Sequence, residues 1–427
     1  MNKPSFVISC PYDTYSGYGA RARDIVKSII ELDKYDVKLL SQKWGNTPLD
    51  FCAENDEWSY LNDLRIPGIQ NGQKPDVWMQ ITIPTEFAPV GKFNIGCTAG
   101  IESTGCAAPW VEGLNRMDIN FVSSEHSKKV FEDIKFEKRN KQTNVVEGVV
   151  KLEKPIEVIF EGFNEDTYKY LKPSEVSLDL SSIKDQFNFL FVGHWMQGAL
   201  GHDRKNVGAM IKYFFDTFNN KKQQPGLILK TSMGRNSYLS REQILDKILQ
   251  IKKVYPSSTK FPNVYLINGS LSDHEMNELY NHPKVKAMVS ITKGEGFGRP
   301  LLEFCLSKKP LIVSSWSGHV DFCQPENTVM LGGNLENVHE SAANQWLLKE
   351  TKWFQVDANQ IKAAYKEVFN KYKQYAVKGK KQGFYVKENF NWTKMKELVG
   401  KVLDKNIPDF PKQVELKMPA GNLPKLQ

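Results

Sequence analysis

Short apolar runs rich in β-branched residues alternate with helical segments along nearly the whole chain. The connections between these segments are short. In the first half, the strand pattern occurs at residues 5–10, 37–41, 75–84, 93–103 and 117–125. The first run leads past Gly17 and Gly19 into a helical segment whose apolar residues include Ile25 and Ile29. Alternation of this kind predicts parallel α/β architecture.

A second series of the same kind begins after residue 168. Its expected strands are 187–195, 227–232, 264–269, 284–292 and 310–315. Asn206 is expected to cap the helix after the first of them. Two later helices are expected to open with capping boxes, in which a serine precedes a Gln or Glu by three positions. These pairs are Ser240 with Gln243 and Ser272 with Glu275.

Two Rossmann-like halves follow from this pattern. We expect a first domain at residues 1–160 and a second at 161–405, with the stretch 138–155 as a loop or hairpin before the boundary. Residues 406–427 contain four prolines and are expected to form an irregular tail.

The composition is that of an ordinary soluble globular protein: 41% of the 427 residues are hydrophobic and 25% are charged. Six cysteines are scattered without a CxxC pair, so the sequence indicates neither a zinc site nor a disulfide framework. The apolar run near the N-terminus is too short for a signal peptide, and no run is long enough to span a bilayer. We therefore expect a cytoplasmic protein with reduced thiols.

The formal net charge of +8 favours anionic ligands without indicating nucleic acid by itself. The lysines gather late in the chain. They are Lys362, Lys366, Lys371, Lys373, Lys378, Lys380 and Lys381. A solvated helix face accounts for them. The alternative is a weak association with an acidic membrane surface or an acidic acceptor.

The stretch GEGFGRPLLEF places Glu295 and Glu303 on either side of a glycine-rich turn. A buried strand precedes it, and Pro300 is well placed as the first residue of a helix. Ligands of open α/β sheets bind beyond the carboxyl ends of the strands, so both acids should lie near one crevice. The alternative is purely structural: Glu303 would complement the helix dipole and the glycines would form a tight turn.

Three other stretches follow expected strands. They are SGYG at 16–19, RKN at 204–206 and SSWSGHVDF at 314–322. Lys and Arg at such ends can neutralise phosphate oxygens, which makes a site for a phosphate-bearing donor plausible.

The motif EGFGRPLLE resembles the E-x7-E signature of retaining glycosyltransferases of family 4, the glycogen-synthase-like and mannosyltransferase-like enzymes with the GT-B fold. The stretches FVGHW…DRKNV, IFEGFNED and FNWTKMKELV are similar to segments of that family as well. The resemblance covers roughly residues 1–405 and is closer in the second half. It implies two Rossmann-like domains facing each other across a cleft, with the C-terminal helix returning to the first domain.

The resemblance also implies a reaction. The enzyme would move a hexose from a nucleotide-diphosphate sugar to a glycan or other saccharide acceptor, or to a lipid-linked saccharide precursor, with no cofactor and no metal. The first domain would be the acceptor side and the second the donor side. The acceptor would attack from the face on which the phosphate leaves, so no strong protein base is needed.

Roles for individual residues come from the same resemblance. Lys205, with Arg204 beside it, would hold the donor diphosphate, and Glu303 would hydrogen-bond the ribose. Glu295 would contact hydroxyl groups of the transferred sugar. The remaining donor-side residues would be Gly17, Gly19, Leu271, Gly296, Phe297, Gly298 and His319. The sequence departs from the family at His194, where many members carry an arginine.

On the acceptor side, Glu102 is the candidate, with a capping or surface role as its alternative. Two other functions stay open. One is a GT-B transferase that acts on DNA bases, although no stable nucleic-acid binding is expected. The other is a non-catalytic protein that binds nucleotide-sugars.

Overall fold

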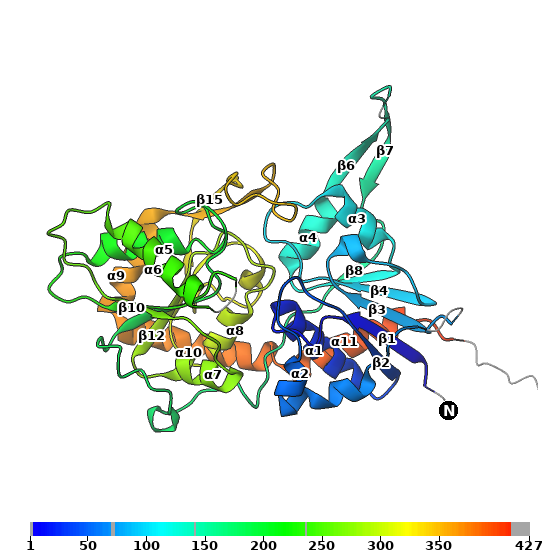
Figure 1. Ribbon diagram of the computed structural model, residues 1–427, viewed down its shortest axis with the longest axis horizontal. Helices are drawn as coiled ribbons and strands as arrows, with labels where there is room; N and C mark the ends of the chain where they lie inside the picture. Colours follow the sequence, from blue (N-terminus) through cyan, green and yellow to red (C-terminus); the bar gives the residue numbers. More distant parts are fainter. Residues whose placement is uncertain (1–2, 70–72, 141, 235–236, 411–427) are drawn as a thin grey trace, which may run out of the picture.

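The computed structural model describes residues 3–69, 73–140, 142–234 and 237–410. Two six-stranded sheets with parallel neighbouring strands form two separate bodies, coloured blue to cyan and green to orange in Figure 1. This arrangement confirms the α/β fold with two Rossmann-like domains. The tail prediction falls largely on residues 411–427, which lie outside the described residues.

The first sheet has the strand order β2-β1-β3-β4-β5-β8. Its strands are β1 (Ser5–Cys10), β2 (Asp36–Ser41), β3 (Val77–Ile81), β4 (Phe93–Cys97), β5 (Ile119–Val122) and β8 (Ile156–Val158). The helical segments of this half are α1 (Gly17–Glu31), α2 (Phe51–Glu54), η1 (Asp56–Leu64), η2 (Pro84–Glu86), α3 (Ala108–Asn115) and α4 (Glu125–Asp133). Every residue of β3 is buried, as expected for a strand covered on both faces.

The second sheet has the order β11-β10-β9-β12-β13-β14. Its strands are β9 (Asn188–Val192), β10 (Gly226–Lys230), β11 (Val264–Ile267), β12 (Val285–Ser290), β13 (Leu311–Ser314) and β14 (Val329–Leu331). The helical segments are η3 (Pro173–Glu175), α5 (Val207–Phe218), α6 (Tyr238–Lys252), α7 (Asp273–Asn281), α8 (Arg299–Cys305), η4 (Gly318–Asp321), α9 (Ala358–Asn370) and α10 (Tyr372–Asn389).

The last helix, α11 (Trp392–Asn406), lies beside α1 of the first domain (Figure 1). Met395, Val399 and Leu403 are buried in the same core cluster as Phe6 and Ile8 of β1. The predicted return of the C-terminal helix is therefore confirmed. The chain leaves the first sheet after β8 and returns to the first domain at Asn391. The domain limits 160 and 405 remain predictions.

The two chain segments that cross between the domains run side by side. Phe163 N donates to Phe390 O at 3.1 Å, and Trp392 N donates to Phe163 O at 3.1 Å. A parallel bridge therefore joins Phe163 and Asn391 at the crossing.

Two antiparallel hairpins extend from the domains. β6 (Lys135–Arg139) and β7 (Val146–Lys151) project from the first domain, so the stretch 138–155 lies partly in a hairpin, which ends at Lys151 (Figure 1). β15 (Gly333–Asn337) and β16 (Lys352–Val356) form an arm of the second domain that reaches the first. There, Thr104 N donates to Lys352 O at 2.8 Å.

Of the predicted helix starts, one capping box is present and others differ in detail. Ser272 and Glu275 form the predicted capping box. The box at Ser240 is wrong, because α6 begins at Tyr238 and its N-cap is Ser237, whose side chain accepts from Ser240 N. Asn206 precedes α5 with a left-handed backbone, and its side chain makes no capping hydrogen bond.

Two further starts lie one or two residues earlier than predicted. Gly17 and Gly19 do not precede α1 but form its first turn, with Ser16 as N-cap. Helix α8 begins at Arg299, so Pro300 is its second residue.

No helix among the described residues combines the length and apolar character needed to cross a bilayer.

Candidate functional site

The candidate site lies where the strand order of the second sheet reverses, between β9 and β12. Parallel sheets of this order bind ligands beyond the carboxyl ends of the strands at that point. Arg204 and Lys205 lie in the loop after β9, and Glu295 lies in the loop after β12. The topology therefore brings together three residues that are far apart in sequence.

Lys205 and Glu295 form a close ion pair. The Lys205 Nζ atom lies 2.5 Å from Glu295 Oε1 and 2.6 Å from Oε2. The two side chains are 16% and 9% exposed. Burial opposes ionisation of Glu295, but the charges of Lys205 and Arg204 outweigh it and lower the pKa of this carboxyl to about 2. Glu295 is therefore a carboxylate at neutral pH.

Arg204 connects the two domains at this point. Its Nη1 donates to Gly294 O at 2.7 Å and lies 3.5 Å from Glu295 Oε2. Its Nη2 lies 3.5 Å from Glu102 Oε1 of the first domain. The predicted acceptor-side acid thus lies against the predicted diphosphate-binding arginine.

The glycine-rich loop abuts the first domain closely. A Cβ atom on Gly296 would lie 2.5 Å from Ala99 O, and one on Gly294 would lie 1.8 Å from Glu102 O. Ser123 Oγ of the first domain donates to Gly296 O at 3.2 Å. The turn thus needs glycine partly because another backbone lies against it, a reason that the sequence alone did not provide.

Gly298 and Phe297 complete the loop. Gly298 has φ of +97°, a left-handed conformation that favours glycine. The Phe297 ring is 2% exposed and packs 5.2 Å from the Phe322 ring. The Phe297 side chain is therefore not available to a ligand.

Glu303 lies on α8 in a separate ionic cluster. Glu303 Oε1 accepts from Arg299 Nε at 3.0 Å, and Oε2 accepts from Tyr280 OH at 3.3 Å. Arg299 also binds Asp24 of α1 in the first domain. Burial raises the pKa of Glu303 to about 7, although Arg299 acts in the opposite direction. The two acids of the motif thus have different partners and different pKa values.

His319 is fully buried beside the glycine loop. Its Nε2 donates to Ser314 O at 2.6 Å, whereas Nδ1 has no partner among the described residues. Burial lowers the pKa of this imidazole, which is therefore neutral. A Cβ built on Gly298 would lie 3.0 Å from His319 Cβ, so the imidazole is a close neighbour of the loop.

The other predicted donor residues lie around this centre with less contact. Gly17 faces open space, whereas a Cβ on Gly19 would lie 2.3 Å from Thr14 O. Leu271, between β11 and α7, packs against the core cluster of the second domain. His194, at the position of the missing arginine, bonds Ser232 Oγ through Nδ1 at 2.9 Å. Within the described part of the chain, none of these four forms a hydrogen bond or ion pair with Glu295.

Sequence reasoning missed two pairs of residues here. Arg299 and Asp24 form an ion pair between the domains, and Arg299 also pairs with Glu303. Only the spacing of Arg299 and Glu303 on one helical face could have indicated part of that cluster. His126 of α4 lies 4.6 Å from the Trp316 ring across the domain junction. No motif marks His126 in the sequence, whereas Trp316 lies in the stretch SSWSGHVDF.

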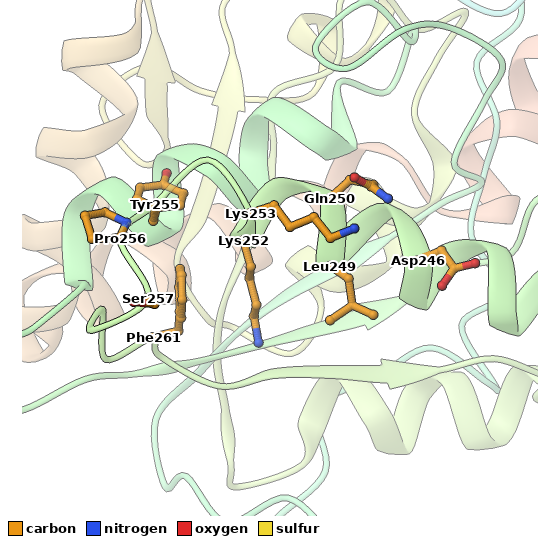
Figure 2. A pocket seen from close by; sticks show the side chains of 9 residues that line it. All are labelled: Asp246, Leu249, Gln250, Lys252, Lys253, Tyr255, Pro256, Ser257 and Phe261. Atoms are coloured by element: carbon orange, nitrogen blue, oxygen red, sulfur yellow. The ribbon is translucent and has the colours of Figure 1, made fainter.

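Two observations bear on other kinds of site. Within the described part of the chain, no group of three or more His, Cys, Asp or Glu side chains is arranged to hold a metal. A cavity of about 420 Å³ lies along α6, where Lys252 extends between Leu249 and Phe261 (Figure 2). It contains none of the predicted site residues.

The chain was compared with known proteins at the level of sequence and of structure. No protein-family profile matches it, and no curated protein matches its sequence. A glycosyltransferase from Rickettsia africae superposes with a TM-score of 0.62 at 14% identity, over 96% of this chain and 100% of that one. The chain has the GT-B fold.

Two further solved structures are similar. Anabaena HepE in complex with UDP-glucose has a TM-score of 0.60 at 12% identity, covering 94% of this chain and 100% of that chain. A trehalose-6-phosphate synthase studied for glycosyl transfer with retention has a TM-score of 0.56 at 12% identity, covering 94% and 99%. At these identities the similarity establishes the fold.

Proposed function

We propose that this protein is a retaining glycosyltransferase that moves a hexose from a nucleotide-diphosphate sugar to a glycan or other saccharide. The observation that carries the proposal is the cluster of Lys205, Arg204 and Glu295 at the switch point of the second sheet, against the first domain. The sequence resemblance to family 4 and the GT-B neighbours support the same reaction class.

Lys205 and Arg204 supply the positive charge that a departing diphosphate requires. The Lys205 ammonium group donates to the Glu295 carboxylate. A bound diphosphate would compete for that ammonium, and Glu295 would then be free to accept hydrogen bonds from hydroxyl groups of the sugar. Glu303 would hold the ribose after exchanging its contact with Arg299 or Tyr280.

Bond formation needs no protein base in this scheme. The acceptor hydroxyl attacks the anomeric carbon from the face on which the phosphate leaves, and a phosphate oxygen takes its proton. The neutral His319 lies near Glu295 without the partner that would make it a strong base. We propose that the reaction requires neither a metal nor a cofactor.

The test is turnover by the purified protein. UDP-glucose is the first donor to assay, because HepE was solved with it, followed by other UDP-, GDP- and ADP-sugars. A donor that raises the unfolding midpoint binds the native state. Release of nucleoside diphosphate with a saccharide acceptor would support transfer, and the anomeric configuration of the product, measured by NMR, distinguishes retention from inversion.

Binding without any release of nucleoside diphosphate would indicate the non-catalytic alternative. No described contact specifically favours action on DNA bases. Absence of binding to every nucleotide-sugar would contradict the proposal.

A further inference from the structure

A second cavity, of about 480 Å³, lies in the second domain where β12 begins and α8 ends. The candidate site lies at the other end of these elements, beyond the carboxyl end of β12 and at the start of α8. The cavity is therefore separate from the residues assigned to the donor.

Four lysines and no carboxylate line this cavity. They are Lys286, Lys308, Lys309 and Lys380. The lining also includes Tyr170 and Tyr372, whose rings bound the space. The cavity in Figure 2 differs, because its lining includes an acid, Asp246.

The ammonium groups are positioned by neutral partners. Lys309 Nζ donates to Tyr280 O at 2.7 Å and to His282 O at 2.9 Å. Lys308 Nζ lies 4.7 Å from the ring centres of Tyr170 and Phe384. Among the described residues, none of the ion pairs includes any of the four lysines.

Their positive charges also act on one another. Burial lowers the pKa of Lys308, and the charges of Lys380 and Lys387 lower it further. Burial lowers the pKa of Lys309 well below its usual range, with Lys286 acting in the same direction. Like charges held together without a counterion favour the binding of an anion.

Asp179 does not line the cavity. The charge of Asp179 reaches His282, but its carboxylate already accepts from Ser181 N at 2.7 Å.

We propose that this cavity binds the phosphate group of an anionic ligand through Lys286, Lys308 and Lys380. Phosphate matches the site because several ammonium groups can donate to its oxygens at once. The phosphate belongs either to a soluble phosphate ester or to a lipid headgroup. Beside these lysines on α10, Val377 is 58% exposed and Phe384 is 44% exposed. This surface is therefore open to a soluble phosphate ester and to a lipid headgroup.

The test compares two variants that lose the same charge. One carries Lys286→Gln, Lys308→Gln and Lys380→Gln, and retains Lys309 because it fastens the end of α7. The control carries Lys221→Gln, Lys222→Gln and Lys366→Gln, which do not line the cavity. Binding is measured with glycerol 3-phosphate by calorimetry, and with phosphatidylcholine vesicles with or without phosphatidic acid by co-sedimentation.

We expect the cavity variant to bind about tenfold or more weakly than the unchanged protein in one arm, and the control to bind within about twofold. Loss in the calorimetric arm identifies a soluble ester, and loss in the vesicle arm alone identifies a lipid headgroup. The donor residues are the same in both variants, so phosphate bound near Lys205 does not affect the comparison.

If the unchanged protein binds neither probe, or if both variants lose affinity equally, the proposal is wrong. If the triple variant does not fold, the single change Lys380→Glu on the exposed face of α10 takes its place in the comparison. This result is independent of any glycosyltransferase activity.

Discussion

Glu295 and Glu303 are both buried, yet their neighbours give the two carboxyl groups opposite properties. Glu295 faces two cations and has a pKa of about 2, whereas Glu303 lies where burial prevails and has a pKa of about 7. One is a fixed negative charge at neutral pH, and the other changes protonation close to it. Different roles for the two acids are therefore physically reasonable.

The first prediction concerns Lys205→Ala. It should weaken binding of the donor and of free nucleoside diphosphate together, by about 1.5–3 kcal/mol, because one charge-assisted contact to phosphate is lost. Calorimetry measures this, with Lys284→Ala as control, since Lys284 is a lysine of the same domain that bonds only the backbone of Leu180 and Ile183 in the described contacts. Unchanged diphosphate affinity would remove Lys205 from the site.

The second prediction separates the two acids by steady-state kinetics. Glu303→Gln should mainly raise the donor KM, because a ribose contact exists equally in the ground and transition states. Glu295→Gln should mainly lower kcat and leave inhibition by nucleoside diphosphate nearly intact, because that ligand lacks the sugar. Circular dichroism must first show that both variants fold. Equal effects of both changes on diphosphate binding would contradict this division.

The third prediction concerns pH and Glu303. Its pKa is raised from 4.5 to about 7 in the folded state, so its contribution to stability is full below 4.5 and is lost as pH rises through 7. The loss amounts to at most about 3 kcal/mol. Glu303→Gln, which resembles the protonated acid, should flatten the dependence of the unfolding free energy between about pH 5 and about pH 8.

Denaturant titrations of both proteins at the two pH values measure that difference. A variant that keeps the full slope would show that Glu303 is already ionised in the folded protein.

At the scale of elements, the glycine loop after β12 determines how closely the domains approach. Gly296→Ala would place a methyl group against Ala99 O, at a distance of 2.5 Å unless the backbone moves. The fourth prediction is that this change lowers turnover at least about tenfold and stability by about 1–3 kcal/mol. Gly148→Ala on the β6–β7 hairpin is the control, because nothing lies within 4 Å of its added carbon. Equal turnover in both variants would show that this contact is dispensable.

The sequence predicted elements better than it predicted their ends and contacts. Continuous apolar runs identified the strands at 5–10 and 187–195, because strands of a buried parallel sheet are apolar on both faces. The cap at Ser240 was misplaced because Ser237, which lacks the Gln or Glu of a capping box, accepts from Ser240 N instead. Ser240 Oγ in turn accepts from Met233 N. Asp24, which binds Arg299 beside Glu303, could not be predicted because it comes from a distant helix.

At the scale of the whole molecule, the proposed chemistry depends on cations from one domain facing the other. The fifth prediction is that turnover persists in excess EDTA, because Lys205 and Arg204 provide the charge that a divalent metal would otherwise supply. The measurement is nucleoside diphosphate release before and after chelation. Activity that disappears and returns only with magnesium or manganese would overturn the proposed donor site.

The return of α11 has a consequence for how the protein can be divided. Its apolar side chains complete the core of the first domain, so that domain is built from two separate parts of the polypeptide. A fragment that ends at residue 160 would expose the surface that Met395, Val399 and Leu403 normally cover. Both crossings lie side by side at Phe163 and Phe390, so the polypeptide links the two domains at a single place, and we expect any opening of the molecule to pivot there.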